Sequence, residues 1–162
     1  MAEEVKSIRT PIRLEYNYTA GQATTRFLHG VAQGKLLGQR CPECKRVYVP
    51  SRGACPRCAV ATAEEVQCAD KGTVTTFAIV RVPSDNLSFD PPYACVQVLL
   101  DGADIPFSHV VQECDLQDVR MGMRVQAVWV PKEELGPTMA SVRYFKPIDE
   151  PDTPFDAYKE HL

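Results

Sequence analysis

The 162-residue sequence lacks any long apolar run. Its first residues, MAEEVKSIRTPIRLEY, contain no apolar segment of the kind found in export signals, and no later run is long enough to cross a bilayer as a helix. Excess positive charge is also lacking, because 18 basic and 21 acidic residues give a formal net charge of −3. This balance argues against a protein that coats nucleic acid by bulk charge. We therefore expect a cytoplasmic protein without a membrane segment.

Residues that commonly perform catalysis are scarce. The three histidines, His29, His109 and His161, have no motif partner nearby, so a structural role is the simpler interpretation of each. Residues 30–36, GVAQGKL, resemble a phosphate-binding P-loop, but the segment is one residue short and Leu36 replaces the Ser or Thr that would hold Mg²⁺. A Gly-x-Ser-x-Gly elbow and a dinucleotide-binding glycine pattern are both absent from the sequence. We expect no catalysis by this chain alone.

A helix is predicted over residues 20–34. Apolar residues recur there at helical spacing, and Thr19 with Gln22 fits a capping box at the start. Gly34 is the expected end of the helix. The apolar stripe of this helix must pack on another part of the protein.

From Lys71 onward the apolar residues alternate with period two and many side chains are β-branched. The pattern predicts five strands, over residues 72–82, 93–100, 105–111, 124–130 and 141–146. A short helix is expected over 115–122, capped by Asp115 and ended by Gly122. Five strands with a helix between the third and the fourth is the order of an OB-fold barrel, and a β-sandwich is the competing interpretation. The predicted fold is mainly β with an N-terminal helix.

These patterns divide the chain into four parts. They are an N-terminal arm with the amphipathic helix (1–34), a cysteine segment (35–66), the predicted barrel (67–148) and a tail rich in proline and acids (149–162). We expect the tail to be either disordered or ordered against a partner.

The chain contains seven cysteines, an odd number that does not suit a complete set of disulfides. In a reducing compartment, clustered cysteines more often bind a metal. The scattered residues Cys68, Cys95 and Cys114 are best interpreted as small buried hydrophobic side chains.

Two Cys-x-x-Cys pairs form the cluster. Cys41 and Cys44 make the first pair, Cys55 and Cys58 the second, and ten residues separate them. A hairpin through 47–49 would bring the pairs together, and four thiolates make a closed tetrahedral site of the kind that holds structural Zn²⁺. We predict such a zinc site, whose metal supplies folding free energy and no chemistry.

Two alternatives to zinc concern the same four cysteines. Rubredoxin binds iron with this ligand set, but it usually has glycine directly after each pair, where this sequence has Lys45 and Ala59. Both departures favour zinc. A redox dithiol is the third alternative, and four neighbouring cysteines argue against it.

Basic residues surround the cysteine pairs, with Glu43 the one acid among them. They are Arg40, Lys45, Arg46, Arg52 and Arg57. They form either a solvated basic surface or a docking face for a phosphate group or an acidic partner.

Several stretches, in order along the chain, resemble the acyl-CoA-associated family catalogued as domain of unknown function 35. They are GKLLGQRC at 34–41, YVP at 48–50, the second cysteine pair, PPY at 91–93, LDG at 100–102 and MGMRV at 121–125. The set covers most of the chain, and the arm and the tail are less typical of the family.

The resemblance implies a rubredoxin-like zinc ribbon followed by a five-stranded OB-fold barrel. It also implies a non-catalytic accessory subunit that stabilises a thiolase-like or lipid-transfer-protein-type acyl-CoA enzyme, such as a thiolase or a steroid side-chain aldolase, and helps to form its acyl-CoA channel. By family position, Arg40, Arg46 and Arg52 are the expected contacts to CoA phosphates.

Single-stranded nucleic-acid binding is the main alternative function, because OB-folds bind such strands on exposed aromatic side chains. The candidate aromatics are Phe77, Tyr93, Phe107, Trp129, Tyr144 and Phe145. Most are equally suited to a core, and the barrel segment has little clustered Lys or Arg. An enzyme that uses a pocket of the barrel is a third hypothesis, which the shortage of paired titratable groups disfavours.

Overall fold

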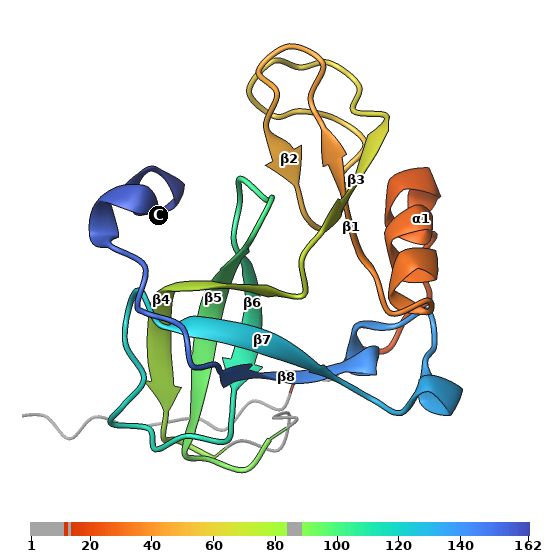
Figure 1. Ribbon diagram of the computed structural model, residues 1–162. Coiled ribbons are helices and arrows are strands. Elements are labelled where there is room, and N and C mark those ends of the chain that lie inside the picture. Colours follow the sequence, from red (N-terminus) through yellow and green to blue (C-terminus); the bar gives the residue numbers. More distant parts are fainter. Residues whose placement is uncertain (1–11, 13, 84–88) are drawn as a thin grey trace, which may run out of the picture.

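The computed structural model describes residues 12, 14–83 and 89–162. One helix, α1 (Gly21–Val31), packs beside a small three-stranded sheet, and a five-stranded barrel lies below that sheet in Figure 1. The small sheet contains β1 (Leu36–Arg40), β2 (Val47–Tyr48) and β3 (Glu64–Cys68). The barrel contains β4 (Lys71–Val80), β5 (Tyr93–Leu100), β6 (Phe107–Val111), β7 (Arg124–Trp129) and β8 (Val142–Pro147). Short 3₁₀ turns are η1 (Lys132–Glu134), η2 (Met139–Ser141), η3 (Phe155–Ala157) and η4 (Lys159–His161).

Helix α1 is shorter than predicted, and its expected cap is wrong. The helix begins at Gly21, so Ala20 is the capping residue and Thr19 lies one position too early to cap it. At the other end, the Gly34 N–H donates to the Val31 carbonyl and Gly34 has a φ of 71°. The last predicted residues therefore form a turn that ends the helix. None of the described helices is both long and apolar enough to pass through a membrane.

Helix α1 lies very close to β1. A Cβ atom on Gly30 would be 2.6 Å from Leu37 Cδ1, so a larger residue there would require the Leu37 side chain to move. Phe27 and Val31 of α1 are buried, and they belong to the same hydrophobic cluster as Leu36 of β1 and the barrel interior. The helix, the base of the small sheet and the barrel therefore share one core.

The barrel has the strand order β4-β5-β6-β8-β7, and β7 pairs back onto β4 to close it. All neighbouring strands are antiparallel except β6 and β8. Each of the five predicted strands is present, and the closed Greek-key barrel confirms the OB-fold prediction over the sandwich. Strict alternation along β5 places Ala94, Val96 and Val98 inside the barrel.

The predicted helix over 115–122 is wrong. Asp118 closes a single turn by donating its N–H to the Asp115 carbonyl. Further along, the Gly122 N–H donates to the Val74 carbonyl and the Val74 N–H donates to the Met123 carbonyl, at 2.8 and 2.9 Å. The backbone of this segment thus bonds with β4, which prevents helical hydrogen bonds at the same groups.

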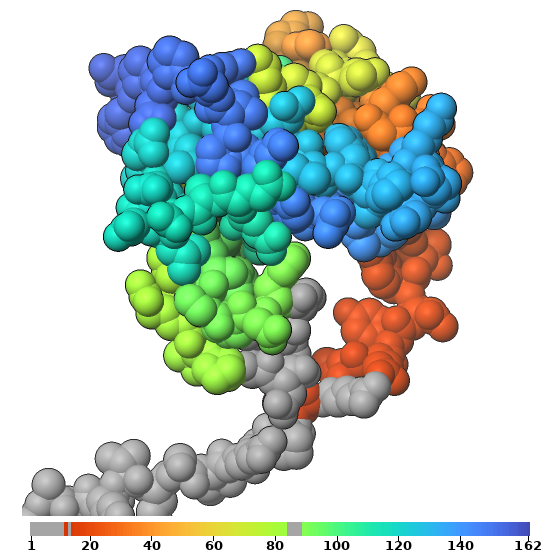
Figure 2. Space-filling view, turned by 60° about the horizontal axis from the view of Figure 1, so that its bottom comes forward, coloured from red at the N-terminus to blue at the C-terminus, as the bar shows by residue number. Residues whose placement is uncertain are grey.

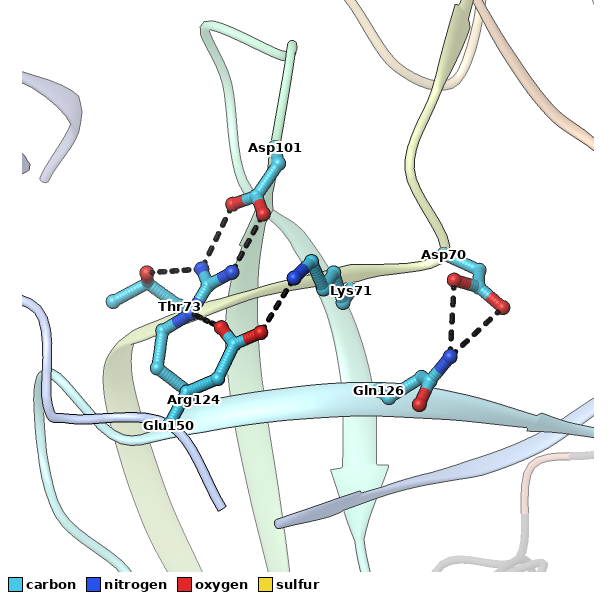
Figure 3. A network of polar contacts seen from close by, with 7 residues as sticks. All are labelled: Asp70, Lys71, Thr73, Asp101, Arg124, Gln126 and Glu150. Carbon is cyan, nitrogen blue, oxygen red and sulfur yellow. Dashed lines mark hydrogen bonds and ion pairs between the residues drawn. The ribbon is translucent and has the colours of Figure 1, made fainter. Parts of the chain in front are cut away.

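The C-terminal tail is ordered against its own chain, so the prediction of a disordered end is wrong. Figure 3 shows how Arg124 binds Asp101 with two nitrogens and Glu150 with a third, while Lys71 also contacts Glu150. These contacts lower the pKa of Glu150, first through Lys71 and then through Arg124. Tyr158 is only 3% exposed. The tail is therefore fixed to the barrel by both ion pairs and burial.

Candidate metal centre

The four predicted cysteine ligands meet at the end of the small sheet. The Sγ atoms of Cys41, Cys44, Cys55 and Cys58 all lie within 4.8 Å of one another. Cys41 and Cys55 are buried, whereas Cys44 and Cys58 are partly exposed. Among the residues that the structure describes, this is the only cluster of three or more candidate metal-ligating side chains. Four sulfur atoms at this spacing suit the tetrahedral coordination of one zinc ion.

The two cysteine pairs have matching backbone geometry. The Lys45 N–H donates to the Cys41 carbonyl at 3.1 Å, and the Ala59 N–H donates to the Cys55 carbonyl at 2.9 Å. Lys45 and Ala59 have φ angles of 63° and 56°, in the left-handed region that glycine adopts more easily. These are the two positions where rubredoxin has glycine. The turns therefore form without glycine, and the difference from rubredoxin is one of side-chain chemistry.

Tyr48 is a residue of this site that the sequence interpretation missed. Its hydroxyl lies 3.2 Å from Cys55 Sγ, and the Cys58 N–H donates to the same sulfur at 3.4 Å. The hydroxyl contact is the main reason why the pKa of Cys55 is lowered to about 6. The sequence does place Tyr48 in the hairpin between the two cysteine pairs, and this position could have indicated a contact with the cysteines.

Without a cation, the cluster does not favour four thiolates. Burial is the main cause that raises the pKa of Cys58 to about 12, and hydrogen bonds with the neighbouring cysteines raise it further. A divalent cation at the centre would offset the repulsion between the sulfur charges, and metal ligation requires the deprotonated form. The donor set therefore fits Zn²⁺, for which all four cysteines would act as thiolate ligands.

The three arginines proposed to contact CoA lie on β1, just before β2 and in the loop after β2. Arg40 on β1 donates to Glu64 at 3.1 Å and to the Lys45 carbonyl at 3.2 Å. Arg46 directly precedes β2 and is partly buried. Arg52 is exposed, and its guanidinium lies 6.0 Å from the Tyr48 ring centroid. Arg40 is thus already engaged by an acid, and Arg52 has the most accessible charge.

The remaining cysteines and the candidate nucleic-acid-binding aromatics differ in their exposure. Cys68 is buried, while Cys95 and Cys114 are partly buried. Of the six aromatics, Phe107 and Phe145 are in the core, three are partly exposed and only Phe77 is classed as exposed. Phe107 and Phe145 are therefore not available for stacking on a base.

Comparisons with known proteins agree with this geometry. Residues 28–62 match the family model for the ChsH2 rubredoxin-like zinc ribbon domain, and residues 65–130 match that for the ChsH2 C-terminal OB-fold domain. A DUF35 domain-containing scaffold protein of Methanocaldococcus jannaschii is 36% identical over 118 residues, which cover 70% of this chain and 82% of the relative. The chain belongs to the DUF35 family. The zinc-ribbon prediction is thereby confirmed at the level of the domain.

Other similar proteins support the same family assignment for this DUF35 protein. A DUF35 domain-containing scaffold protein of Pyrococcus furiosus is 28% identical over 107 residues, 66% of this chain and 77% of the relative. A solved structure described as an Ltp2-ChsH2(DUF35) aldolase matches with a TM-score of 0.60 and 20% identity, covering 81% of this chain and 98% of that chain. A DUF35 protein of unknown function from Sulfolobus solfataricus matches with a TM-score of 0.61 and 19% identity, covering 79% and 87%. At these identities, the two solved structures establish a common fold.

Proposed function

We propose that this DUF35 protein is a non-catalytic accessory subunit that binds and stabilises a thiolase-like enzyme of the lipid-transfer-protein type. One observation carries the proposal. Ribbon and barrel together match a chain described as part of an Ltp2-ChsH2(DUF35) aldolase, and the match covers 98% of that chain. The relatives from Methanocaldococcus jannaschii and Pyrococcus furiosus are scaffold proteins by name, which supports the same role. A steroid side-chain aldolase or a thiolase is the proposed partner.

The chemistry of the described residues supports a role without catalysis. The one cluster of metal-ligating side chains found among them consists of four cysteines, which would leave no open position on a zinc ion. A zinc ion at such a site would stabilise the fold of the ribbon and would not activate a water molecule.

A surface for the partner is available on the N-terminal arm. Leu14, Tyr16 and Tyr18 alternate along it and are 79%, 77% and 73% exposed. Tyrosine is enriched in the centres of protein interfaces, and a run of large exposed apolar side chains marks an interaction site. We propose that this arm packs against the partner enzyme, while the ribbon and the barrel supply a rigid support.

The test is co-purification. The tagged full-length protein is expressed with a thiolase-like enzyme from the same genome, and eluted proteins and zinc are quantified. We expect the two proteins to elute together with about one zinc per DUF35 chain. A triple variant, L14D/Y16D/Y18D, should lose the enzyme and keep its zinc, whereas the exposed V82D control should keep both. Elution of nucleic acid without an enzyme would instead support the alternative function.

The proposed function includes contact with CoA, whose phosphates would bind Arg40, Arg46 and Arg52. Replacing Arg46 and Arg52 by Glu, and Arg40 by Gln so that no second carboxylate stands beside Glu64, should weaken CoA binding by the purified complex without lowering its zinc content. Lys132, exposed on η1, gives a control in K132E. Unchanged CoA affinity in the arginine variant would remove these contacts from the proposal and leave the scaffold role intact.

A further inference from the structure

The N-terminal arm has the side-chain pattern of a β-strand. Large side chains occupy every second position and polar residues lie between them; the large ones are Ile12, Leu14, Tyr16 and Tyr18. In a helix, where successive residues turn by about 100°, these four side chains would fall on two opposite sides. In a strand they share one face, and tyrosine and isoleucine both favour strands. The pattern therefore indicates a strand with one apolar face.

The structure keeps this arm outside the sheets of its own chain. Residues 14–19 are all exposed, and they belong to no helix or strand. Figure 2 shows the described part of the arm, in red, projecting from the body of the molecule. The ring centroids of Tyr16 and Tyr18 are 6.4 Å apart, close to the roughly 6.7 Å that two residues span along a strand. The arm thus presents the side chains of a strand without a sheet to which they belong.

The backbone of the arm determines which kind of partner surface fits it. Burying Leu14, Tyr16 and Tyr18 against another protein also removes water from the peptide groups between them. Buried N–H and C=O groups are almost always hydrogen-bonded. A purely apolar groove would cover the side chains but would leave these groups without partners, whereas the outer strand of a sheet offers N–H and C=O groups at the matching spacing. An unpaired sheet edge therefore satisfies both the side chains and the backbone.

We propose that the arm binds the partner enzyme as an added β-strand, on the unpaired outer edge of one of the enzyme's sheets. This inference rests on the proposed function and specifies the surface that the enzyme must present. Leu14, Tyr16 and Tyr18 enter apolar hollows on one face of that sheet, and the polar side of the arm faces water. The N–H and C=O groups of every second arm residue bond with the enzyme, and those of the intervening residues point to solvent.

Hydrogen exchange resolved to single amides by mass spectrometry tests the proposal. The zinc-loaded full-length protein is measured alone and with the thiolase-like enzyme used for co-purification. On binding, the amides of alternate residues from Leu14 to Tyr18 should exchange at least about tenfold more slowly, while the intervening amides change little. Protection of consecutive amides would indicate a helix, and no protection would indicate docking by side chains alone; either result would overturn the proposal.

Two further outcomes separate this inference from the proposed function. Alternate protection that is already present in the free protein would mean that the arm pairs with its own chain, and it would overturn the inference. A complex with an unprotected arm would overturn the inference and leave the accessory role intact. Absence of any complex would overturn both.

Proline variants test the same alternation, because proline lacks the N–H group and is compatible with an extended backbone. Y16P is compared with Y16A, and N17P with N17A, so that the loss of each side chain is controlled. The N–H groups of adjacent residues point to opposite sides of a strand. One proline should therefore weaken enzyme binding about tenfold beyond its alanine control, and the other by less than about threefold. Equal effects of the two prolines would overturn the proposal. All four variants should keep their zinc, since no cysteine ligand lies in the arm.

Discussion

Removing the metal should unfold the end of the small sheet while the barrel remains folded. The cluster that holds this end together consists of Cys41, Tyr48 and Cys55, packed with Cys44, Cys58, Val60 and Ile105. Four of these seven side chains are the proposed zinc ligands. A C44S variant, and the wild-type protein treated with a strong chelator, would each disrupt the metal site.

The size of the effect follows from comparing the stability that side-chain burial contributes to this end of the sheet with the stability that zinc contributes. The three non-ligand side chains, Tyr48, Val60 and Ile105, contribute at most roughly 5–9 kcal/mol if each is fully buried. Structural zinc contributes about 10–16 kcal/mol in small zinc-binding domains. The metal is therefore the larger contribution.

Hydrogen exchange read out by mass spectrometry measures this effect. In the zinc-free protein, amides of Tyr48 and of residues 53–60 should exchange at nearly unprotected rates, while those of β5 should stay protected because Val96 and Val98 are in the barrel core. C95S, which changes a cysteine on β5 outside the cluster, is the matched control and should keep its zinc. Unchanged protection at Tyr48 after complete zinc removal would refute this reasoning.

Three further predictions concern the site and the tail. Y48F should lose zinc to a competing chelator more readily, because Cys55 loses the hydroxyl that stabilises its thiolate, and a chelator titration against the wild type measures this. The pKa of Glu150 is lowered by folding, so its stabilising contribution is present above its ordinary pKa and is lost as pH falls through the folded pKa. Thermal unfolding between about pH 5 and pH 3 should therefore depend less on pH in E150Q than in the wild type. G122A should destabilise the protein by about 1 kcal/mol or more, since the φ of Gly122 is 88° and a Cβ would lie 2.8 Å from the Thr153 carbonyl oxygen; equal denaturation midpoints would contradict this.

The parts that the sequence predicted well are those determined by local pattern. Period-two alternation places the five barrel strands, because each strand must bury one face. The four cysteines are predicted by their spacing, because two residues between ligands suit a tight turn around a metal. Both signals arise within a few neighbouring residues.

The parts that the sequence did not predict depend on distant contacts. Residues 115–122 have a helix-like cap and stop, but hydrogen bonds from Gly122 and Met123 to Val74 decide their structure. The tail has the composition of a disordered end, but Glu150 pairs with Arg124 and Lys71 of the barrel. The role of Tyr48 likewise depends on the meeting of its hydroxyl with Cys55 Sγ in space. Composition and periodicity contain no information on such pairings.

The connection between the small sheet and the barrel bears on how a scaffold would work. Asp104, in the loop between β5 and β6, accepts a hydrogen bond from the Val47 N–H through its carboxylate and donates its own N–H to the Val47 carbonyl, at 2.8 and 2.9 Å. The Asp104 carbonyl also lies 2.7 Å from His161 Nδ1 in the tail. Ribbon, barrel and tail are therefore joined at one point beside their shared core. Because this point is next to the strand between the two cysteine pairs, metal binding stabilises the same junction that fixes the orientation of the ribbon on the barrel. A partner enzyme that contacts both would then bind a surface of fixed shape only in the zinc-loaded protein.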